Sequence, residues 1–119
     1  MNKFRDLKVY QKGIKFSQHI YDLTSCFPKS EIFGLTTQLR RAACSIVLNI
    51  AEGAGSDSNR EFVRYLEHSQ KSTFETMAGM DIAKEIGLIK NSDYDACQQE
   101  LIEISVMLKG LQQSLRKRL

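Results

Sequence analysis

The last third of the chain carries apolar residues at intervals that alternate between three and four positions without a break. These residues are Tyr94, Cys97, Leu101, Ile104, Leu108, Leu111 and Leu115. At about 100° of rotation per residue, this spacing puts all of them on one face of an α-helix, as in the seam of a coiled coil. Such a face is stable only when it packs against other helices, so the pattern predicts a helical bundle.

Helix start and stop signals divide the chain into four predicted helices. They span residues 6–25, 35–52, 58–86 and 92–116. Pro28 ends the first helix, and Ser58 with Glu61 has the spacing of a capping box that opens the third. Gly87 is a natural stop for the third helix, and Ser92 is the expected N-cap of the fourth. Because the connections are short, consecutive helices should run in opposite directions, which gives an up-down-up-down antiparallel four-helix bundle.

The composition supports one all-α domain that spans residues 1–119. The chain has only one proline and no tryptophan, and its apolar and charged fractions of 42% and 26% are typical of globular proteins. Cys26, Cys44 and Cys97 form no Cys-x-x-Cys pair, which favours free thiols in a reducing compartment. No secretory signal begins the chain, and no apolar run reaches the ~18 residues of a membrane span. We therefore expect a cytoplasmic protein with no membrane partner.

The first predicted helix carries two apolar stripes that lie on different faces. One stripe consists of Leu7, Tyr10, Ile14, Ser17 and Tyr21, and the other consists of Val9, Phe16, Ile20, Leu23 and Phe27. A single stripe is enough for the core of a bundle. The pattern alone leaves two interpretations open: one wide core face, or a core stripe with a second stripe that contacts another copy of the chain.

The second predicted helix carries a polar strip where a small bundle is expected to be apolar. Its members are spaced three, four, four and three apart: Gln38, Arg41, Ser45, Asn49 and Glu52. In an antiparallel hairpin, Arg41 lies level with Glu75, and Glu52 lies level with Arg60 and Arg64. The strip is therefore expected to form a structural ladder of ion pairs and hydrogen bonds with the third helix. Two other interpretations are a solvated face and acid–base chemistry by Glu52 and Glu75, which the lack of a nearby histidine disfavours.

The net charge of +3 is small, but the basic residues gather near the two ends of the chain. Residues 1–15 carry five basic residues against one acidic residue, residues 109–118 carry four basic residues and no acidic one, and the remainder is net negative. In an antiparallel bundle these segments share one end with the turn between the second and third helices. A one-sided basic patch at that end predicts binding to nucleic-acid phosphates.

The predicted phosphate-binding residues are Arg5, Lys8, Lys12, Lys15, Arg60, Arg64, Arg116, Lys117 and Arg118. The competing interpretation of the same residues is a solubilising tail and a solvated helix face. No aromatic residues alternate with the lysines of the first helix, so we do not expect the protein to read base sequence.

The sequence shows no pattern that indicates catalysis, a metal or a cofactor. His19 and His68 have no second ligand at helical metal-site spacing, and the Glu-x-x-His pairs of di-iron bundles are absent. The GAGS turn lacks the Gly-Lys-Ser/Thr of a phosphate loop. We therefore expect no enzyme activity, no metal and no cofactor.

Longer stretches of the sequence resemble a known family. They are FRDLKVYQKG at residues 4–13, FGLTTQLRRAACSIVLNIAEG at 33–53, EFVRYLEHSQKSTFE at 61–75 and AKEIGLI at 83–89. These stretches resemble the four-helix-bundle proteins encoded in intervening sequences of bacterial 23S rRNA genes, whose fold is shared by the accessory variability protein of diversity-generating retroelements. Tyr10 stands where that family is expected to have tryptophan, and Gln70 stands where a small residue is common.

This resemblance implies an assembly and a class of partner. It implies a homo-oligomeric ring, expected to be a homopentamer, and it favours one stripe of the first helix as the oligomer contact: Val9, Phe16, Ile20 and Leu23. It implies no enzyme activity, and the retroelement members bind nucleic acid and a reverse transcriptase. Two hypotheses follow. One is non-specific binding of RNA or DNA through the basic surface, and the other is a protein scaffold, for example for a reverse transcriptase, without nucleic-acid affinity of its own.

Overall fold

The structure contains four long helices whose limits lie close to those predicted. In the computed structural model, which describes residues 3–119, they are α1 (Lys8–Thr24), α2 (Leu35–Ala54), α3 (Asn59–Glu85) and α4 (Asn91–Arg116). Single 3-10 turns occur at Lys3–Asp6 and Lys29–Glu31. Residues 3–119 contain no strand, which confirms the all-α prediction. None of these helices has an apolar stretch that could cross a bilayer.

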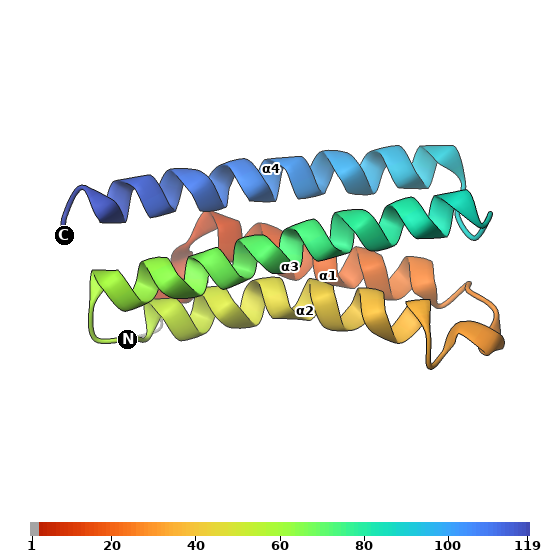
Figure 1. The fold of residues 1–119 in the computed structure, drawn as a ribbon, viewed down its shortest axis with the longest axis horizontal. Coiled ribbons are helices and arrows are strands. Elements are labelled where there is room, and N and C mark those ends of the chain that lie inside the picture. The colour runs from red at the N-terminus through yellow and green to blue at the C-terminus, as the bar shows by residue number, and fades with distance from the viewer. Residues whose placement is uncertain (1–2) are drawn as a thin grey trace.

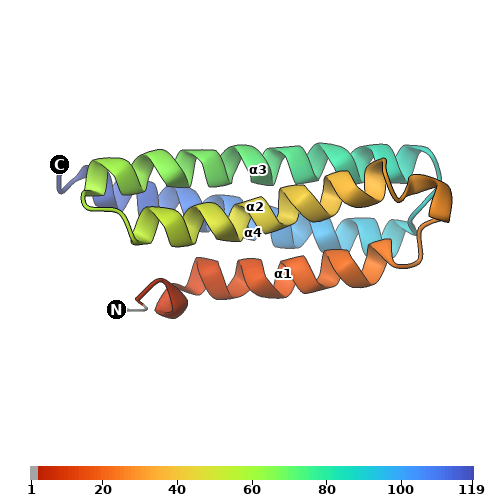
Figure 2. The same ribbon diagram turned by 90° about the horizontal axis from the view of Figure 1, so that it is seen from below.

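The helices lie side by side along the long axis of a body that measures 46 × 22 × 19 Å. Figure 1 shows the start of α1, the end of α4 and the α2–α3 turn together at one end, which we call the terminal end. The α1–α2 and α3–α4 connections lie at the opposite end, which we call the distal end, and the perpendicular view in Figure 2 agrees. The basic segments near the two chain ends are therefore brought to the same end of the molecule.

Local signals set both ends of α3 as the sequence predicts. The Ser58 hydroxyl accepts a 3.1 Å hydrogen bond from the Glu61 backbone N–H, which caps the first turn. At the other end Gly87 has a φ of 81°, and the Leu88 N–H donates to the Ala83 carbonyl at 2.9 Å. This bond and the positive φ form a Schellman motif, a conformation that favours glycine.

Two predicted helix starts are shifted in the structure. Leu7 has extended backbone, with φ −68° and ψ 126°, so α1 begins at Lys8 rather than at residue 6. Lys90 also has extended backbone, with φ −74° and ψ 153°, so α4 begins at Asn91. The predicted N-cap Ser92 is therefore wrong, because this residue already lies inside the first turn of the helix.

The apolar faces of all four helices meet in one core. The largest fully buried apolar side chains are Phe16 and Ile20 of α1, Leu39, Ile46 and Ile50 of α2, Leu66 and Met80 of α3, and Leu101, Ile104 and Leu108 of α4. The predicted seam of α4 is confirmed. Five of its seven members are buried, and the other two, Tyr94 and Leu111, are partly buried against the core.

The prediction that one stripe of α1 contacts another copy is wrong in its choice of residues. Val9, Phe16 and Ile20 are at most 4% exposed within a single chain. Leu23 is half-buried against the same core. These four side chains face the other helices of their own chain, so they are not available to a second copy.

The physical reason for this correction is a close approach between α1 and α2. A Cβ atom on Gly13 would lie 2.9 Å from Val47 Cγ1, so the missing side chain lets the two helices pack closely. This contact turns the stripe that contains Val9, Phe16 and Ile20 toward the other helices of the chain. In the other stripe of α1, Leu7 and Tyr10 are partly buried against the core, whereas Ile14 and Tyr21 are left at the surface, 46% and 45% exposed.

The α2–α3 seam is also closed by glycines. A Cβ atom on Gly79 would lie 2.6 Å from Leu39 Cδ2, and one on Gly53 would lie 2.7 Å from the Tyr65 Cβ. The Gly53 position is the more constrained, because the Phe62 carbonyl oxygen would also lie 3.2 Å away. Backbone and Cβ atoms cannot move aside as the tip of a leucine can, so α2 and α3 depend on glycine at this point.

The Gly53→Ala substitution should therefore destabilise the protein by about 1–3 kcal/mol through overpacking. The matched control is Gly110→Ala on α4, where an added Cβ meets nothing within 4 Å. This control should raise stability by up to about 1 kcal/mol, since alanine is the better helix former. Urea denaturation of both variants measures the difference, and equal shifts in the two would contradict the packing argument.

Candidate nucleic-acid interface

Part of the polar strip of α2 forms a hydrogen-bonded seam with α3. The Ser72 hydroxyl donates to the Ser45 hydroxyl at 2.9 Å, and the Gln38 side-chain amide donates to the Glu75 carboxylate. The Asn49 amide donates to the Ser45 backbone carbonyl at 2.8 Å, within α2. The strip therefore joins the two helices through one pair of hydroxyl groups and one amide–carboxylate hydrogen bond.

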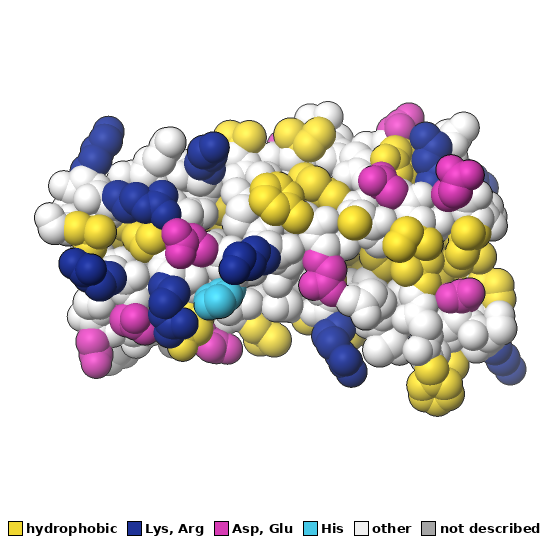
Figure 3. All heavy atoms as spheres, in the orientation of Figure 1, with side chains coloured by type: hydrophobic (Ala, Val, Ile, Leu, Met, Phe, Trp, Pro, Cys, Tyr) yellow, Lys and Arg dark blue, Asp and Glu magenta, His cyan; other side chains and the backbone are white. Residues whose placement is uncertain are grey.

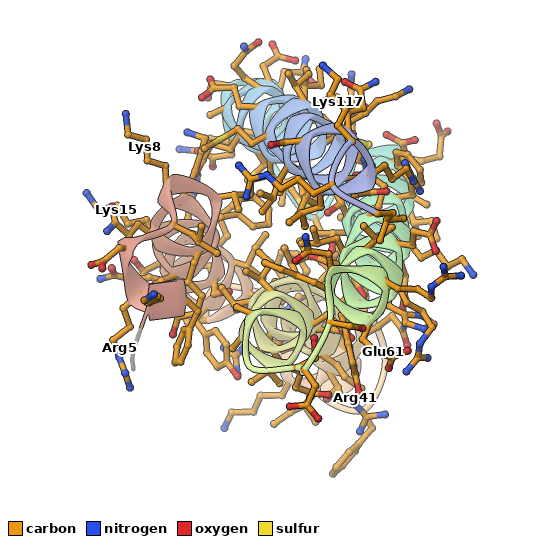
Figure 4. All side chains as sticks on the ribbon, turned by 90° about the vertical axis from the view of Figure 1, so that its left-hand side faces the viewer. Arg5, Lys8, Lys15, Arg41, Glu61 and Lys117 are labelled. Atoms are coloured by element: carbon orange, nitrogen blue, oxygen red, sulfur yellow. The ribbon has the colours of Figure 1, made fainter. Side chains whose placement is uncertain are left out.

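The ion pairs predicted for this strip are not formed. Arg41, Glu52 and Glu75 are exposed, and no ion pair among residues 3–119 joins Arg41 to Glu75 or Glu52 to a partner on α3. Arg64 pairs instead with Glu61 of its own helix at 3.0 Å. Figure 4 shows Arg41 at the edge of the bundle. The reason is the close approach of α2 and α3, which leaves room for hydroxyls between them but not for long charged side chains.

The stability that the seam provides should come from its buried hydroxyls. Ser69 is fully buried, and its hydroxyl donates to the Ile46 carbonyl across the seam at 2.7 Å. Ser69→Ala should cost about 1 kcal/mol, because this hydrogen bond is removed. Arg41→Ala should change stability by less than about 0.5 kcal/mol, because the side chain is solvated. Thermal or urea melts compare the two, and a destabilisation of several kcal/mol in Arg41→Ala would support a buried ion pair instead.

The basic residues of α1 point away from the body of the protein. Figure 4 shows Lys8 and Lys15 on the outer side of α1 and Arg5 on the 3-10 turn before it, with Lys117 on a different side of the bundle. Lys12 belongs to the same helix face, but its ammonium pairs with Glu103 of α4 at 2.7 Å. This pair also holds the pKa of the Glu103 carboxyl below its usual value. The predicted stripe is therefore partly neutralised and does not converge with the basic end of α4.

A more concentrated basic site lies in a groove between α3 and α4 at the terminal end. The groove has a volume of about 790 Å³. Its lining consists of Arg64, Glu67, His68, Gln70, Lys71 and Phe74 of α3 and Lys109, Gln112, Gln113 and Arg116 of α4. Figure 3 shows the dark blue basic side chains gathered over this end of the face, and the hydrophobic side chains mostly toward the other end.

The cations of this groove differ in how far they are neutralised. Arg116 pairs with Glu67 at 2.7 Å, and Arg64 pairs with Glu61, whose pKa is lowered by that contact. Lys71 and Lys109 form no ion pair with any residue that the structure describes. Four cations thus line the groove against a single carboxylate, and two of them are free to meet an anion.

Sequence reasoning identified only part of this site. Arg64 and Arg116 were among the predicted binding residues, whereas Lys71 lies in a stretch whose net charge is negative and gave no signal. Arg60, Lys117 and Arg118 are exposed near the same end but do not line the groove. Phe74 lies in the groove and is 53% exposed, so an aromatic ring does accompany the cations here.

The floor of the groove contains an unusual polar residue. The Gln70 amide nitrogen donates to the Ser105 carbonyl of α4 at 3.1 Å. Its buried carbonyl oxygen has no hydrogen-bond partner among the described residues. Gln70 therefore links α3 to α4 beside the basic side chains of the groove.

Metal-ligating side chains also meet elsewhere in the structure, although the sequence predicts no metal site. His19 of α1 lies beside Cys97 and Glu100 of α4. Burial, with the negative charges of Glu100 and Asp93, raises the pKa of the Cys97 thiol to about 12. The signal was missed because His19 is far from the other two in sequence and only the fold brings them together.

Comparisons with known proteins agree with the fold. The sequence model of the family described as 23S rRNA-intervening sequence protein matches residues 5–110. A crystal structure of a protein of unknown function from the S23 ribosomal protein family of Bacteroides thetaiotaomicron superposes with a TM-score of 0.81. It is 23% identical, and the match covers 87% of this chain and 96% of that one, which supports the fold alone. No curated protein matches the sequence.

Proposed function

The chain belongs to the family of 23S rRNA-intervening sequence proteins, and we propose that it binds nucleic acid through backbone phosphates in the α3–α4 groove. The observation that carries this proposal is the convergence of Arg64, Lys71, Lys109 and Arg116 around one groove that holds a single carboxylate. Ammonium and guanidinium groups on rigid helices release counterions when they meet phosphates, which is the main source of such affinity.

Binding of this kind is largely independent of base sequence. Phosphate contacts fix the position of a strand but do not distinguish its bases. Phe74 adds an exposed ring that can stack on any base, which suits single-stranded RNA or DNA. Arg5 before α1, Lys8 and Lys15 on α1, and Lys117 and Arg118 after α4 add positive charge outside the groove.

The charge-reversal pair Lys71→Glu and Lys109→Glu tests this groove. We expect the double variant to bind single-stranded RNA and DNA roughly tenfold or more weakly, whatever their sequence, because two phosphate contacts are replaced by repulsion. The slope of log affinity against log salt should fall by about 0.7 for each lysine that no longer meets a phosphate of a single strand. Fluorescence anisotropy across a salt series measures both quantities.

The matched control reverses two exposed lysines at the distal end, Lys29→Glu and Lys90→Glu, which changes the net charge equally. It should keep most of the affinity of the wild type. A third variant, Lys8→Glu with Lys15→Glu, measures the contribution of α1. Equal binding by the groove variant and the control would contradict the groove, and no binding by the wild type at low salt would favour a protein scaffold instead.

We further propose that copies of the chain assemble into a ring, which the resemblance described above sets at five. Two exposed apolar faces support this assembly. Ile14, Tyr21 and Leu48 lie on the outer side of α1 and α2, and Leu48 is 59% exposed. Ile102 and Val106 lie on α4 and are 51% and 65% exposed.

Seen end-on in Figure 4, the α1–α2 pair and the α3–α4 pair lie on opposite sides of the bundle. Two different faces in contact generate a ring when the rotation closes.

Single charges on either face should disrupt this ring. Tyr21→Glu and Val106→Glu each place a carboxylate in one half of the proposed contact, so mass photometry should show mostly smaller species in both. Ser114→Glu is the control, because it adds the same charge at another exposed position of α4. A wild type that is monomeric at micromolar concentration would contradict the proposal.

A further inference from the structure

Three side chains of the kinds that hold transition metals meet between α1 and α4, away from the basic groove. The His19 Nδ1 atom lies 2.7 Å from Glu100 Oε1 and 3.8 Å from Cys97 Sγ. All three potential ligand atoms lie within 4.8 Å of one another. Each is a common metal ligand, and they are of three different chemical types: imidazole, thiol and carboxylate.

The fold explains why these side chains converge. Cys97 and Glu100 are three residues apart, so they share one face of α4. His19 reaches them from α1, across the seam where two neighbouring helices of this bundle pack least closely. Cys97 is fully buried, whereas the side chains of His19 and Glu100 are 31% and 27% exposed. One ligand is thus fixed in the core and two lie at the edge of the seam.

We propose that His19, Cys97 and Glu100 form a binding site for a divalent transition metal ion, with Zn²⁺ the best match, which ties α1 to α4. Zn²⁺ accepts nitrogen, sulfur and oxygen ligands together, and three protein ligands with one open position are a common arrangement for it. Harder ions such as Mg²⁺ and Ca²⁺ take oxygen ligands and do not select a thiol.

The distances require only small movements to reach tetrahedral coordination. With metal–ligand bonds of about 2.0–2.3 Å, two ligand atoms of a tetrahedral site lie about 3.3–3.8 Å apart. The His19 to Cys97 separation already falls in this range. The His19 to Glu100 distance must lengthen from 2.7 Å, which the flexible, partly exposed glutamate side chain allows. On binding, the metal replaces the thiol proton, which is released to water.

An entry path and a favourable charge accompany the three ligands. A groove of about 300 Å³ runs beside the site and is lined by His19, Asp22, Cys26 and Asp93 among other residues. Its two carboxylates attract a cation, and Lys90 is the one basic residue of its lining. The groove leaves His19 open to solvent, so a water molecule can fill the fourth position on the ion.

The simpler interpretation is a histidine–glutamate ion pair next to an ordinary buried cysteine. That interpretation accounts for the 2.7 Å contact but assigns no role to the sulfur atom, which lies against the same ring nitrogen. A metal site gives all three side chains a role, because each can supply one ligand atom to the ion. The two interpretations differ in a direct observable, which is a bond between the metal and the thiolate.

Cobalt(II) serves as the spectroscopic probe for this site, and Zn²⁺ as the competitor. Titration of the reduced full-length protein with Co²⁺ should give one ion per chain and a thiolate-to-cobalt charge-transfer band in the near ultraviolet. Addition of Zn²⁺ should remove the band and raise the melting temperature. Cys44→Ser is the matched control and should leave the band unchanged, whereas Cys97→Ser should abolish it.

His19→Gln and Glu100→Gln test the other two ligands at positions where the fold tolerates a change. Each should weaken Co²⁺ binding by at least tenfold while circular dichroism shows an intact helical bundle. The proposal is overturned if the wild type gives no charge-transfer band with excess Co²⁺. It is also overturned if the band survives Cys97→Ser, or if His19→Gln binds Co²⁺ as tightly as the wild type.

Discussion

The close packing of α2 on α3 is the constraint on which the rest of the bundle depends, and at its centre the Ser69 hydroxyl of α3 donates a 2.7 Å hydrogen bond to the Ile46 backbone carbonyl of α2. The Ser45–Ser72 bond and the close approach of Gly79 to Leu39 lie on the same seam. Small side chains and hydroxyls allow backbones to approach more closely than leucines do. The other two helices pack onto this pair, α1 mainly on α2 and α4 mainly on α3.

The α2–α3 seam is the most closely packed of the bundle, and the α1–α4 seam on the other side is the least closely packed. Long charged side chains cannot enter the α2–α3 seam, so Arg41 and Glu52 remain in solvent. They do enter the α1–α4 seam, where the ammonium of Lys12 meets Glu103 and the imidazole of His19 meets Glu100. The ion pairs that join α1 to α4, the two helices farthest apart in the sequence, are therefore found where the packing is looser.

The parts of the structure that can be predicted from the sequence are those that depend only on residues close together in the sequence. The seam of α4 and the ends of α3 at Ser58 and Gly87 follow from spacing and backbone preference alone. The choice between the two stripes of α1 does not, because both are apolar and the contact of Gly13 with Val47 decides it. The basic groove was predicted only in part for the same reason: Lys71 joins Lys109 through the packing of α3 on α4, which no local pattern encodes.

The same packing of α3 on α4 supports the groove as a binding surface rather than a collection of charges. The Gln98 amide donates to the Met77 carbonyl at 3.2 Å, and the Gln70 amide donates to the Ser105 carbonyl, so bonds from both helices fix their register. Cations on helices held in this way lose less freedom on binding than cations on loops or tails. One groove offers few phosphate contacts. In the proposed ring, several copies of the groove would bind the same nucleic acid together and raise the overall affinity. The proposed assembly and the proposed binding are thus linked, since the affinity gained from each groove would depend on the number of copies that present it.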